Sequence, residues 1–378
     1  MAKRRTKSVE SPHAGRIRRL RALLKGPGVD HLVVSNPMDV AYLTGFLGGD
    51  SWLIVGPGKA TLVSDFRYQE EVESFRPLVK TIMRTGQMAD AVADELAARG
   101  AERIGVQGDH MTLSLEAHLK KSLRRHGYAA GALKHTTALV SKLRAVKDET
   151  EVALIRKAIK IQEGALEATL DKIEIGMSEL DVGSILEFEM KARGSSDPSF
   201  ATIVGAGANS SQGHYSPSEK AKIRANSPVL IDWGATWRGY HSDMTRVVVF
   251  GTWPRKIAEI YQIVLEAHEA SAAALRPGAG CREVDAVARK IISDAGYGDR
   301  FGHGLGHGIG LNIHEAPGMG AKAPKDAVLE EGNVVTIEPG VYLPGVGGVR
   351  IENDYLVTGR GSTNLCSLPR DIRWATRR

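Results

Sequence analysis

Cysteine is scarce in this sequence, and long apolar runs are missing from it. Two cysteines, Cys281 and Cys366, can form one disulfide at most and supply no Cys-x-x-Cys pair. Neither a disulfide framework nor a thiolate zinc ribbon is therefore available. No apolar run approaches the roughly 18 residues that a membrane-spanning helix needs, and the first 21 residues contain no apolar core of a signal peptide. We expect a cytoplasmic protein with reduced thiols.

Aromatic residues make up only 6% of the chain and proline only 15 positions, whereas hydrophobic residues make up 42% and charged residues 25%. This composition is that of an ordinary globular protein and excludes long disordered or collagen-like architectures. At roughly 100–200 residues per domain, a chain of 378 residues allows two or three domains.

The net charge of +6 is concentrated at the two ends of the chain. Residues 1–25 carry nine basic residues against Glu10, and residues 370–378 carry four against Asp371, so the remainder is net acidic. This distribution argues against a folded nucleic-acid surface. We expect solvated basic tails, with residues 1–14 disordered, and neither nucleic acid nor membrane as a partner. A mitochondrial-type leader is the alternative for the N-terminus.

The first part of the chain, residues 15–141, is predicted to be a small α/β domain because helical and extended patterns alternate along it. The charged stretch that follows marks the domain junction, and Asp148 or Thr150 can cap a long helix running to about residue 173. The predicted helices of this part cover 15–25, 88–99 and 112–126, and its strands lie in HLVVSN, SWLIVG and ATLVSD.

The second part, residues 142–378, combines helices with two predicted β-hairpins of parallel design. The first hairpin carries Asp232 and Asp243, one on each strand, and the second carries Glu338 and Glu352 in the same way. Pro254 suits the first turn of a helix. The predicted helices cover 178–194, 254–275 and 281–295, and the strands cover 200–205, 228–233, 240–250, 333–343 and 348–358.

The four hairpin acids are difficult to explain as a solvated face. Asp232 follows Val229, Leu230 and Ile231, and a buried carboxylate without a partner is strongly penalised. One such acid would ordinarily pair with an arginine or cap a turn. Four acids in matched hairpins instead favour a metal site.

A glycine-rich stretch, FGHGLGHGIGLNIHE, supplies His303, His307 and His314. Such a density of glycine usually marks a close approach of backbone to a ligand. His303 and His307 have His-x-x-x-His spacing, but Gly304 stands where a zincin has its glutamate, and no phosphate-binding glycine pattern fits. A single histidine would ordinarily be a hydrogen-bonded structural residue; three in one such loop predict a functional role, without deciding which one binds metal.

Two aspartates, two glutamates and a histidine form a hard ligand set, suited to manganese, iron, cobalt or zinc. Four carboxylates would neutralise two divalent ions. The sequence therefore predicts a two-metal hydrolytic site.

Four segments of the chain resemble those of the pita-bread-fold metallopeptidases, whose members include aminopeptidase P, prolidase, methionine aminopeptidase and creatinase. These segments are DWGATWRGYHSDMTR, GHGLGHGIGLNIHE, TIEPGVY and GVRIEND, in that order. The N-terminal part is similar to the proline-peptidase and creatinase branch in RRLRALLKGPGVDHLVVSNPMDVAYLTGFLGGD and LVSDFRYQEE. The resemblance implies an α/β (α+β) protein: a creatinase-like N-terminal domain at 15–141 and, at 142–378, a pita-bread domain of curved antiparallel sheet with flanking helices.

The resemblance also implies a role for each site residue. Glu338 would accept the proton of the attacking water, His214 and His314 would contact the scissile carbonyl and the tetrahedral intermediate, and His303 and Arg350 would line the substrate side. Gly213 precedes His214 where proline peptidases often have proline. The implied metal ligands are Asp232, Asp243, His307, Glu338 and Glu352, with Asp243 and Glu352 bridging two divalent ions, manganese first and cobalt, zinc or iron as alternatives.

The function that the resemblance implies is removal of an N-terminal residue that precedes proline, by an Xaa-Pro aminopeptidase or a prolidase acting on dipeptides. Proline-containing peptides are the expected partners, and the expected assembly is a homodimer or higher homo-oligomer. The alternatives are a creatinase-like C–N hydrolase or lyase and a non-catalytic peptide-binding module. The presence of all five ligand positions disfavours both alternatives.

Overall fold

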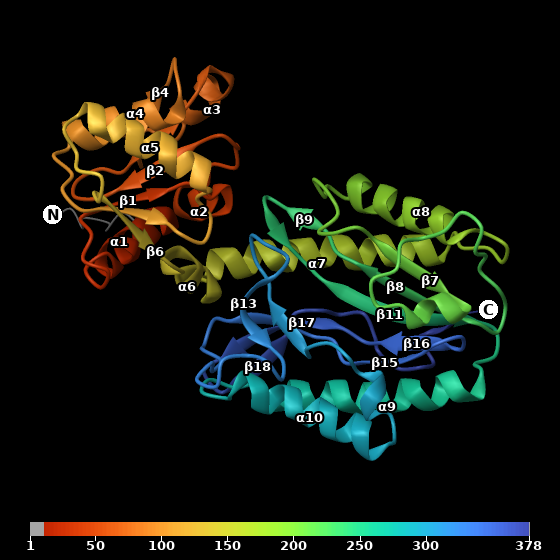
Figure 1. The fold of residues 1–378 in the computed structure, drawn as a ribbon. Coiled ribbons are helices and arrows are strands. Elements are labelled where there is room, and N and C mark those ends of the chain that lie inside the picture. The colour runs from red at the N-terminus through yellow and green to blue at the C-terminus, as the bar shows by residue number, and fades with distance from the viewer. Residues whose placement is uncertain (1–10, 378) are drawn as a thin grey trace, which may run out of the picture. The chain divides into compact units, whose positions relative to one another are not determined.

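The computed structural model describes residues 11–377, which divide into a unit ending at Arg144 and a unit beginning at Ala145 (Figure 1). No helix in the described part of the chain is long and apolar enough to cross a membrane.

The first unit is built on a six-stranded mixed sheet of order β4-β3-β2-β1-β5-β6, in which β1 runs antiparallel to β2 and parallel to β5. Its strands are β1 (His31–Val34), β2 (Trp52–Val55), β3 (Thr61–Ser64), β4 (Lys80–Met83), β5 (Ile104–Gln107) and β6 (Leu133–Thr136). Its helices are α1 (Pro12–Leu23), α2 (Pro37–Thr44), α3 (Gln69–Glu73), α4 (Met88–Ala98) and α5 (Leu113–Arg125), with α6 (Leu139–Ala145) at the junction.

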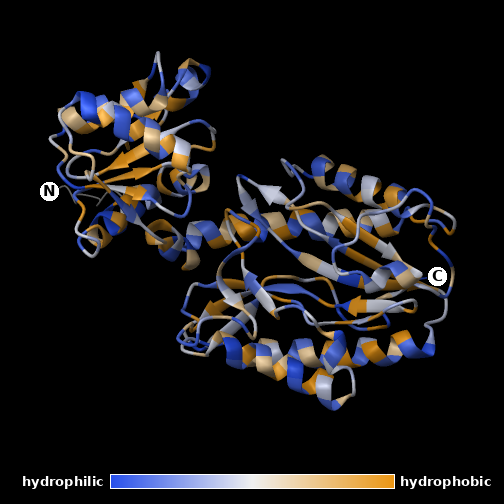
Figure 2. Cartoon of the chain, viewed as in Figure 1, coloured by the Kyte–Doolittle hydropathy of each residue, from blue (hydrophilic) through white to orange (hydrophobic). Residues whose placement is uncertain are grey.

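Apolar strands form the core of the first unit, as the hydropathy colouring shows (Figure 2). Val33, Ile54 and Val63 of the sheet pack in one cluster with Leu96 of α4 and Leu119 of α5. The predicted three strands and three helices of this unit are confirmed, whereas the helices α2, α3 and α6 and the strands β4 to β6 escaped prediction. The strand β6 is partly exposed and includes a lysine and a histidine, so it lacks the apolar run that marks a buried strand.

The predicted N-terminal tail overlaps α1. This helix begins at Pro12, three residues before its predicted start, because proline is well suited to the first helical turn. Residues 1–10 of the predicted tail lie outside the described residues.

The second unit contains a four-stranded sheet of order β19-β11-β8-β7 and a five-stranded sheet of order β13-β12-β14-β17-β18. The helices α7 and α8 lie on one side of these sheets, and α9 and α10 lie on the other (Figure 1). The helices are α7 (Glu149–Leu170), α8 (Glu179–Ala192), α9 (Arg255–Ala274) and α10 (Cys281–Asp294). The strands are β7 (Ile203–Ala206), β8 (Pro228–Trp233), β9 (Thr236–Trp237), β10 (Tyr240–His241), β11 (Met244–Phe250), β12 (Gly306–Gly308), β13 (Glu315–Met319), β14 (Val334–Ile337), β15 (Gly340–Leu343), β16 (Gly347–Arg350), β17 (Asn353–Thr358), β18 (Gly361–Asn364) and β19 (Thr376–Arg377).

Both predicted hairpins are present, but their long strands are interrupted. The predicted strand 240–250 is divided into β10 and β11, and β8 pairs antiparallel with β11. The predicted strands 333–343 and 348–358 each break in the middle, so that β14 pairs with β17 and β15 with β16 in a separate two-stranded sheet. Glu338 and Glu352 lie at these breaks. Pro254 is the N-cap residue of α9 rather than part of its first turn.

The expectation of a solvated C-terminal tail is wrong for residues 370–377. The strand β19 joins the sheet parallel to β11, with Val249 opposite Thr376, and Ala375 is fully buried. Ala375 packs in the core of the second unit, so burial of this residue holds the basic end against the fold.

Candidate metal centre

The second unit brings its two hairpins and its histidine loop together through backbone hydrogen bonds at the strand breaks. The N–H of Glu338 donates to the carbonyl of Leu305 at 2.8 Å, and the N–H of Glu352 donates to that of Thr245 at 3.2 Å. These two bonds replace ladder bonds that the interrupted strands lack. As a result, Glu338 lies against the histidine loop and Glu352 lies against the first hairpin.

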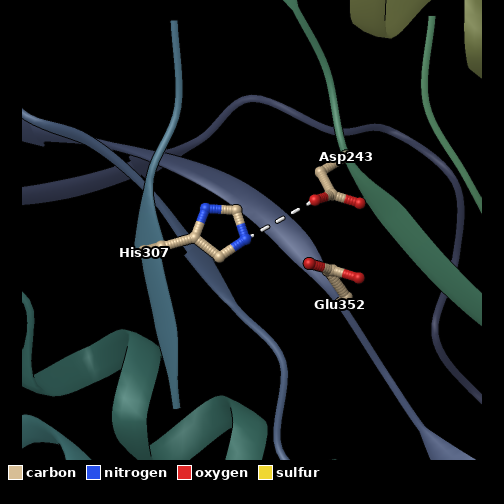
Figure 3. A group of neighbouring side chains, drawn as sticks. All are labelled: Asp243, His307 and Glu352. Carbon is tan, nitrogen blue, oxygen red and sulfur yellow. Dashed lines mark ion pairs between the residues drawn. The ribbon is translucent and has the colours of Figure 1, made fainter. Parts of the chain in front are cut away.

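Asp243, His307 and Glu352 form the tightest group of candidate ligands, and their side chains converge from three separate segments (Figure 3). One ligand atom of each lies within 4.8 Å of those of the other two. His307 Nε2 is 3.6 Å from Asp243 Oδ2 and 3.5 Å from Glu338 Oε1. The group therefore has the residue types and the spacing of a cation site.

The tautomer of His307 follows from its neighbours. Its Nδ1 lies 3.1 Å from the carbonyl oxygen of Gly308, which can only accept a hydrogen bond, so Nδ1 carries the hydrogen. Burial lowers the His307 pKa to about 4, and the ring is neutral near pH 7. Its Nε2 lone pair is thus directed at the carboxylates and is free to bind a metal.

Asp232 and Glu352 are held by a buried polar chain. Arg350 Nη2 donates to Asp232 Oδ2 at 2.5 Å, and its Nε donates to Thr245 Oγ1 at 2.9 Å. Thr245 Oγ1 in turn donates to Glu352 Oε2 at 2.6 Å. Arg350 also donates to the hydroxyl of Tyr342 at 2.8 Å. These hydrogen bonds orient Oδ2 of Asp232 and Oε2 of Glu352. The second oxygen of each carboxylate is not held by these donors.

Burial and mutual repulsion disfavour the ionised forms of the clustered acids. Burial raises the pKa of Asp243 well above its ordinary value, and the charges of Glu352, Asp232 and Glu338 raise it further. Burial likewise raises the pKa of Glu352, with Glu338 adding to it, and raises that of Glu338 to about 8. Arg350 supplies one positive charge to these four acids, and a divalent ion would supply the positive charge that is still missing.

Two buried carboxylate oxygens also fit a metal. Among residues 11–377, Asp232 Oδ1 and Asp243 Oδ1 have no hydrogen-bond partner. Buried oxygens are normally satisfied. The residues present therefore suit the divalent ions that the donor set predicts.

A cavity of about 400 Å³ brings all the predicted site residues together. Its apolar wall includes Phe200, Ala201 and Ile203. The group of Asp243, His307 and Glu352 does not include the other two predicted ligands. Asp232 faces Arg350, and Glu338 faces His307. The predicted residues that line the cavity are Asp232, Asp243, His214, His303, His307, His314, Glu338, Arg350 and Glu352.

His303 and His307 have different surroundings. His303 Nε2 lies 2.9 Å from the hydroxyl of Tyr342, and burial lowers the pKa of this histidine to about 4. His307 faces the acids and packs edge-on against His314, with ring centroids 4.4 Å apart. The two histidines of the His-x-x-x-His pair thus point at different partners.

Three polar residues of the site were absent from the sequence prediction: Tyr342, Thr245 and Thr336. Thr336 accepts from the N–H of His307 at 3.1 Å and donates to Glu338 Oε1 at 3.3 Å. Each of the three lies within four residues of a predicted acid, on an adjoining strand. Their nearness in the sequence to a predicted acid could have marked them as site residues. The sequence does not reveal which side chain each hydroxyl would hydrogen-bond.

Two family models match the chain, and together they cover most of it. The model of metallopeptidase family M24 matches residues 153–359, and that of the creatinase/prolidase N-terminal domain matches residues 16–146.

Relatives and solved structures agree with these matches over nearly the full length. The Xaa-Pro dipeptidase of Pyrococcus furiosus is 36% identical, with 94% of this chain and 99% of the relative covered. The structure of the Xaa-Pro dipeptidase from Bacillus anthracis has a TM-score of 0.90 at 36% identity, covering 95% of this chain and 99% of that one. That of the X-Pro aminopeptidase from Thermotoga maritima has a TM-score of 0.85 at 32% identity, covering 94% and 99%. The predicted α/β fold, with its smaller N-terminal part and pita-bread catalytic part, is confirmed.

Proposed function

This chain belongs to metallopeptidase family M24, and on that premise we propose that it hydrolyses the peptide bond between an N-terminal residue and proline. The observation that carries the proposal is the cavity in which neutral His307, the buried carboxylates of Asp232, Asp243 and Glu352, and the partly exposed carboxylate of Glu338 converge. Relatives named Xaa-Pro dipeptidase and X-Pro aminopeptidase support proline as the residue after the cleaved bond.

The family uses divalent metal ions, and we propose two per chain, with manganese as the physiological ion. The ligands would be Asp232, Asp243, His307, Glu338 and Glu352, of which Asp243 and Glu352 would bridge. Bound in this set, divalent ions would acidify a water molecule and polarise the scissile carbonyl. Four carboxylates balance the charge of two such ions.

Glu338 and the side chains around the ligands would transfer the proton and bind the substrate. Glu338 accepts a proton from the attacking water and returns it to the proline nitrogen, which is a poor leaving group until it is protonated. His214 and His314 contact the scissile carbonyl, and His303 with Arg350 lines the substrate side. An Xaa-Pro bond is a tertiary amide without an N–H, so recognition depends on fitting the ring and holding the free amine.

The two alternative functions fit the site less well. A creatinase-like C–N hydrolase or lyase would not require this set of five ligands. A non-catalytic peptide-binding module would have no need to retain them. All five positions line one cavity, which favours the metallopeptidase over both.

The test is metal analysis and peptide hydrolysis with the full chain. We expect close to two divalent ions after manganese titration, and cleavage of Ala-Pro-containing peptides that stops when a chelator removes the metal. Ala-Ala and Ala-Ala-Ala serve as controls and should be poor substrates. A folded protein that binds no divalent ion, or one that cleaves the control peptides equally well, would contradict the proposal.

A further inference from the structure

A second cavity adjoins the metal cavity within the second unit. It has a volume of about 480 Å³ and shares His303, Gly304 and Gly306 with the metal cavity. Its other walls include Gly318 and Gly320, in and after β13. The two cavities therefore border the same histidine loop.

The wall of the second cavity includes residues of an edge strand. β13 is the edge strand of its five-stranded sheet, and an edge strand is where an added peptide segment can lie. A side-chain carbon added at Gly302 or Gly318 would meet nothing within 4 Å. The groove is thus open at these two positions, with room for residues beyond the first two of a peptide.

Arg350, the arginine that lines the metal cavity, is already paired. Arg350 donates to Asp232, Thr245 and Tyr342. Its guanidinium therefore faces protein acceptors on three of its nitrogens.

The partly exposed arginine of the second cavity, Arg289, is also paired. Arg289 makes two hydrogen bonds to the Asp285 carboxylate, at 2.5 and 3.0 Å, and donates to the carbonyls of Phe301 and His303. Lys322, the remaining lysine or arginine on the walls of either cavity, is exposed and lines only the second one.

This arrangement disfavours a free carboxylate on the proline of a bound substrate. An Xaa-Pro dipeptide would bring that carboxylate into the metal cavity, where Arg350, its one arginine among the described residues, is already paired. Removing such a charge from water without a partner is costly. In a longer peptide the same position is a neutral amide, and the terminal carboxylate lies farther along, toward exposed Lys322.

Building on the function proposed above, we propose that the second cavity binds the residues that follow proline, so that the enzyme prefers peptides of three or more residues to Xaa-Pro dipeptides. His303, Gly304 and Gly306 would form the passage from the metal cavity to this subsite.

The first experiment compares kcat/KM of the manganese-loaded full chain for Ala-Pro, Ala-Pro-amide and Ala-Pro-Ala-Ala. We expect Ala-Pro-Ala-Ala to exceed Ala-Pro by at least about tenfold, with Ala-Pro-amide in between because it removes the charge without filling the subsite. Equal or faster cleavage of Ala-Pro would overturn the inference and leave the proposed function standing. Cleavage of none of the three would overturn the proposed function as well.

The second experiment compares Gly318→Leu with its matched control Gly318→Ala, which adds only one carbon in open space. Leucine should fill the groove, so the ratio of kcat/KM for Ala-Pro-Ala-Ala over Ala-Pro-amide should fall toward one. The alanine variant should retain the wild-type ratio. Circular dichroism and metal content establish that both variants are folded and loaded. An unchanged ratio in the loaded leucine variant would show that residues after proline bind elsewhere.

Discussion

Glu338 lies between the histidine loop and the acid cluster. Its backbone is fixed by the bond to Leu305, and its Oε1 lies 3.5 Å from His307 Nε2 and accepts from Thr336 at 3.3 Å. One oxygen of Glu352 also accepts from a threonine, Thr245, but this threonine in turn accepts from Arg350, which links Glu352 to the arginine. The two glutamates at matching strand breaks therefore have different surroundings, and their substitution should have different effects.

Replacing Glu338 with glutamine keeps the shape of the side chain and one oxygen but removes the base. We expect kcat to fall by roughly 10²–10⁴, one metal to bind more weakly, and peptide binding to survive. Glu352→Gln should instead weaken both metals. Metal stoichiometry, inhibitor affinity and kcat are measured for the two variants side by side. Near-normal kcat in Glu338→Gln with both metals bound would mean that another group carries the proton, with His214 or His314 next.

The two histidines of the His-x-x-x-His pair give a second test. His307→Ala should lower metal affinity by more than the roughly 10–100-fold typical of losing an outer partner of a ligand, because Nε2 itself faces the acids. His303→Ala should retain the metals and lose about 10²-fold in kcat/KM through poorer substrate placement. Isothermal titration with manganese separates the two effects. Equal loss of metal in both variants would refute the assignment.

At the scale of the elements, the start of α7 is fixed by a capping box. Asp148 accepts from the N–H groups of Thr150 and Glu151, and Glu151 accepts from the N–H of Asp148. Of the two predicted caps, Asp148 is therefore the cap and Thr150 lies inside the helix.

Asp148→Ala should lower the free energy of unfolding by about 1 kcal/mol, since two helix N–H groups lose their acceptor. Thr150→Ala is the matched control. It removes a hydroxyl that donates to Asp148 but no acceptor of a helix N–H, so its effect should be smaller. Urea denaturation monitored by circular dichroism measures both changes. A larger loss for Thr150→Ala would contradict this account of the helix start.

The hairpins show how far the sequence can be interpreted. Alternation of apolar residues and the turn signals predict the pairing of β8 with β11 and the acids on matched strands. They do not predict the breaks at Glu338 and Glu352, because the partners of their N–H groups, Leu305 and Thr245, come from other segments. For the same reason the sequence supplies the acids and histidines of the site but not the bond between Arg350 and Asp232. Local pattern determines the elements, and tertiary contacts determine which side chains meet.

At the scale of the whole molecule, the candidate ligands all belong to the second unit, where they lie on or beside strands of its two larger sheets. The first unit has its own core and sheet. The stability of the second unit should therefore respond to metal, and that of the first unit should not. The cytoplasmic location and homo-oligomeric state expected from the sequence stay predictions.

Acid should destabilise the second unit through His268. This side chain is fully buried on α9, and among residues 11–377 neither ring nitrogen has a hydrogen-bond partner. Burial lowers its pKa well below the ordinary 6.5, and the charges of Arg370 and Arg246 lower it further. The unfolded chain then binds a proton that the folded chain does not, so stability is full above about pH 6.5 and falls as pH decreases.

The measurement is the urea midpoint between pH 7.5 and 5 in the presence of chelator, for the wild type and His268→Leu. The wild type should lose up to about 1.4 kcal/mol per pH unit more than the variant below pH 6.5. Parallel pH profiles would show that His268 is not the responsible group.

Metal binding should stabilise one unit selectively. A ligand that binds only the folded state adds about 2.7 kcal/mol at a free concentration one hundred times its dissociation constant, and the candidate ligands lie on or beside β8, β11, β12, β14 and β17. Hydrogen exchange with saturating manganese should therefore be slower in peptides from these strands than with chelator, and unchanged in β1 and β5, which belong to the first unit. Asp243→Asn, which weakens a proposed bridging ligand while keeping its shape, should reduce the difference. Equal protection of both units by manganese would mean that the ion acts outside this centre, because a site confined to the second unit has no differential contact with the first.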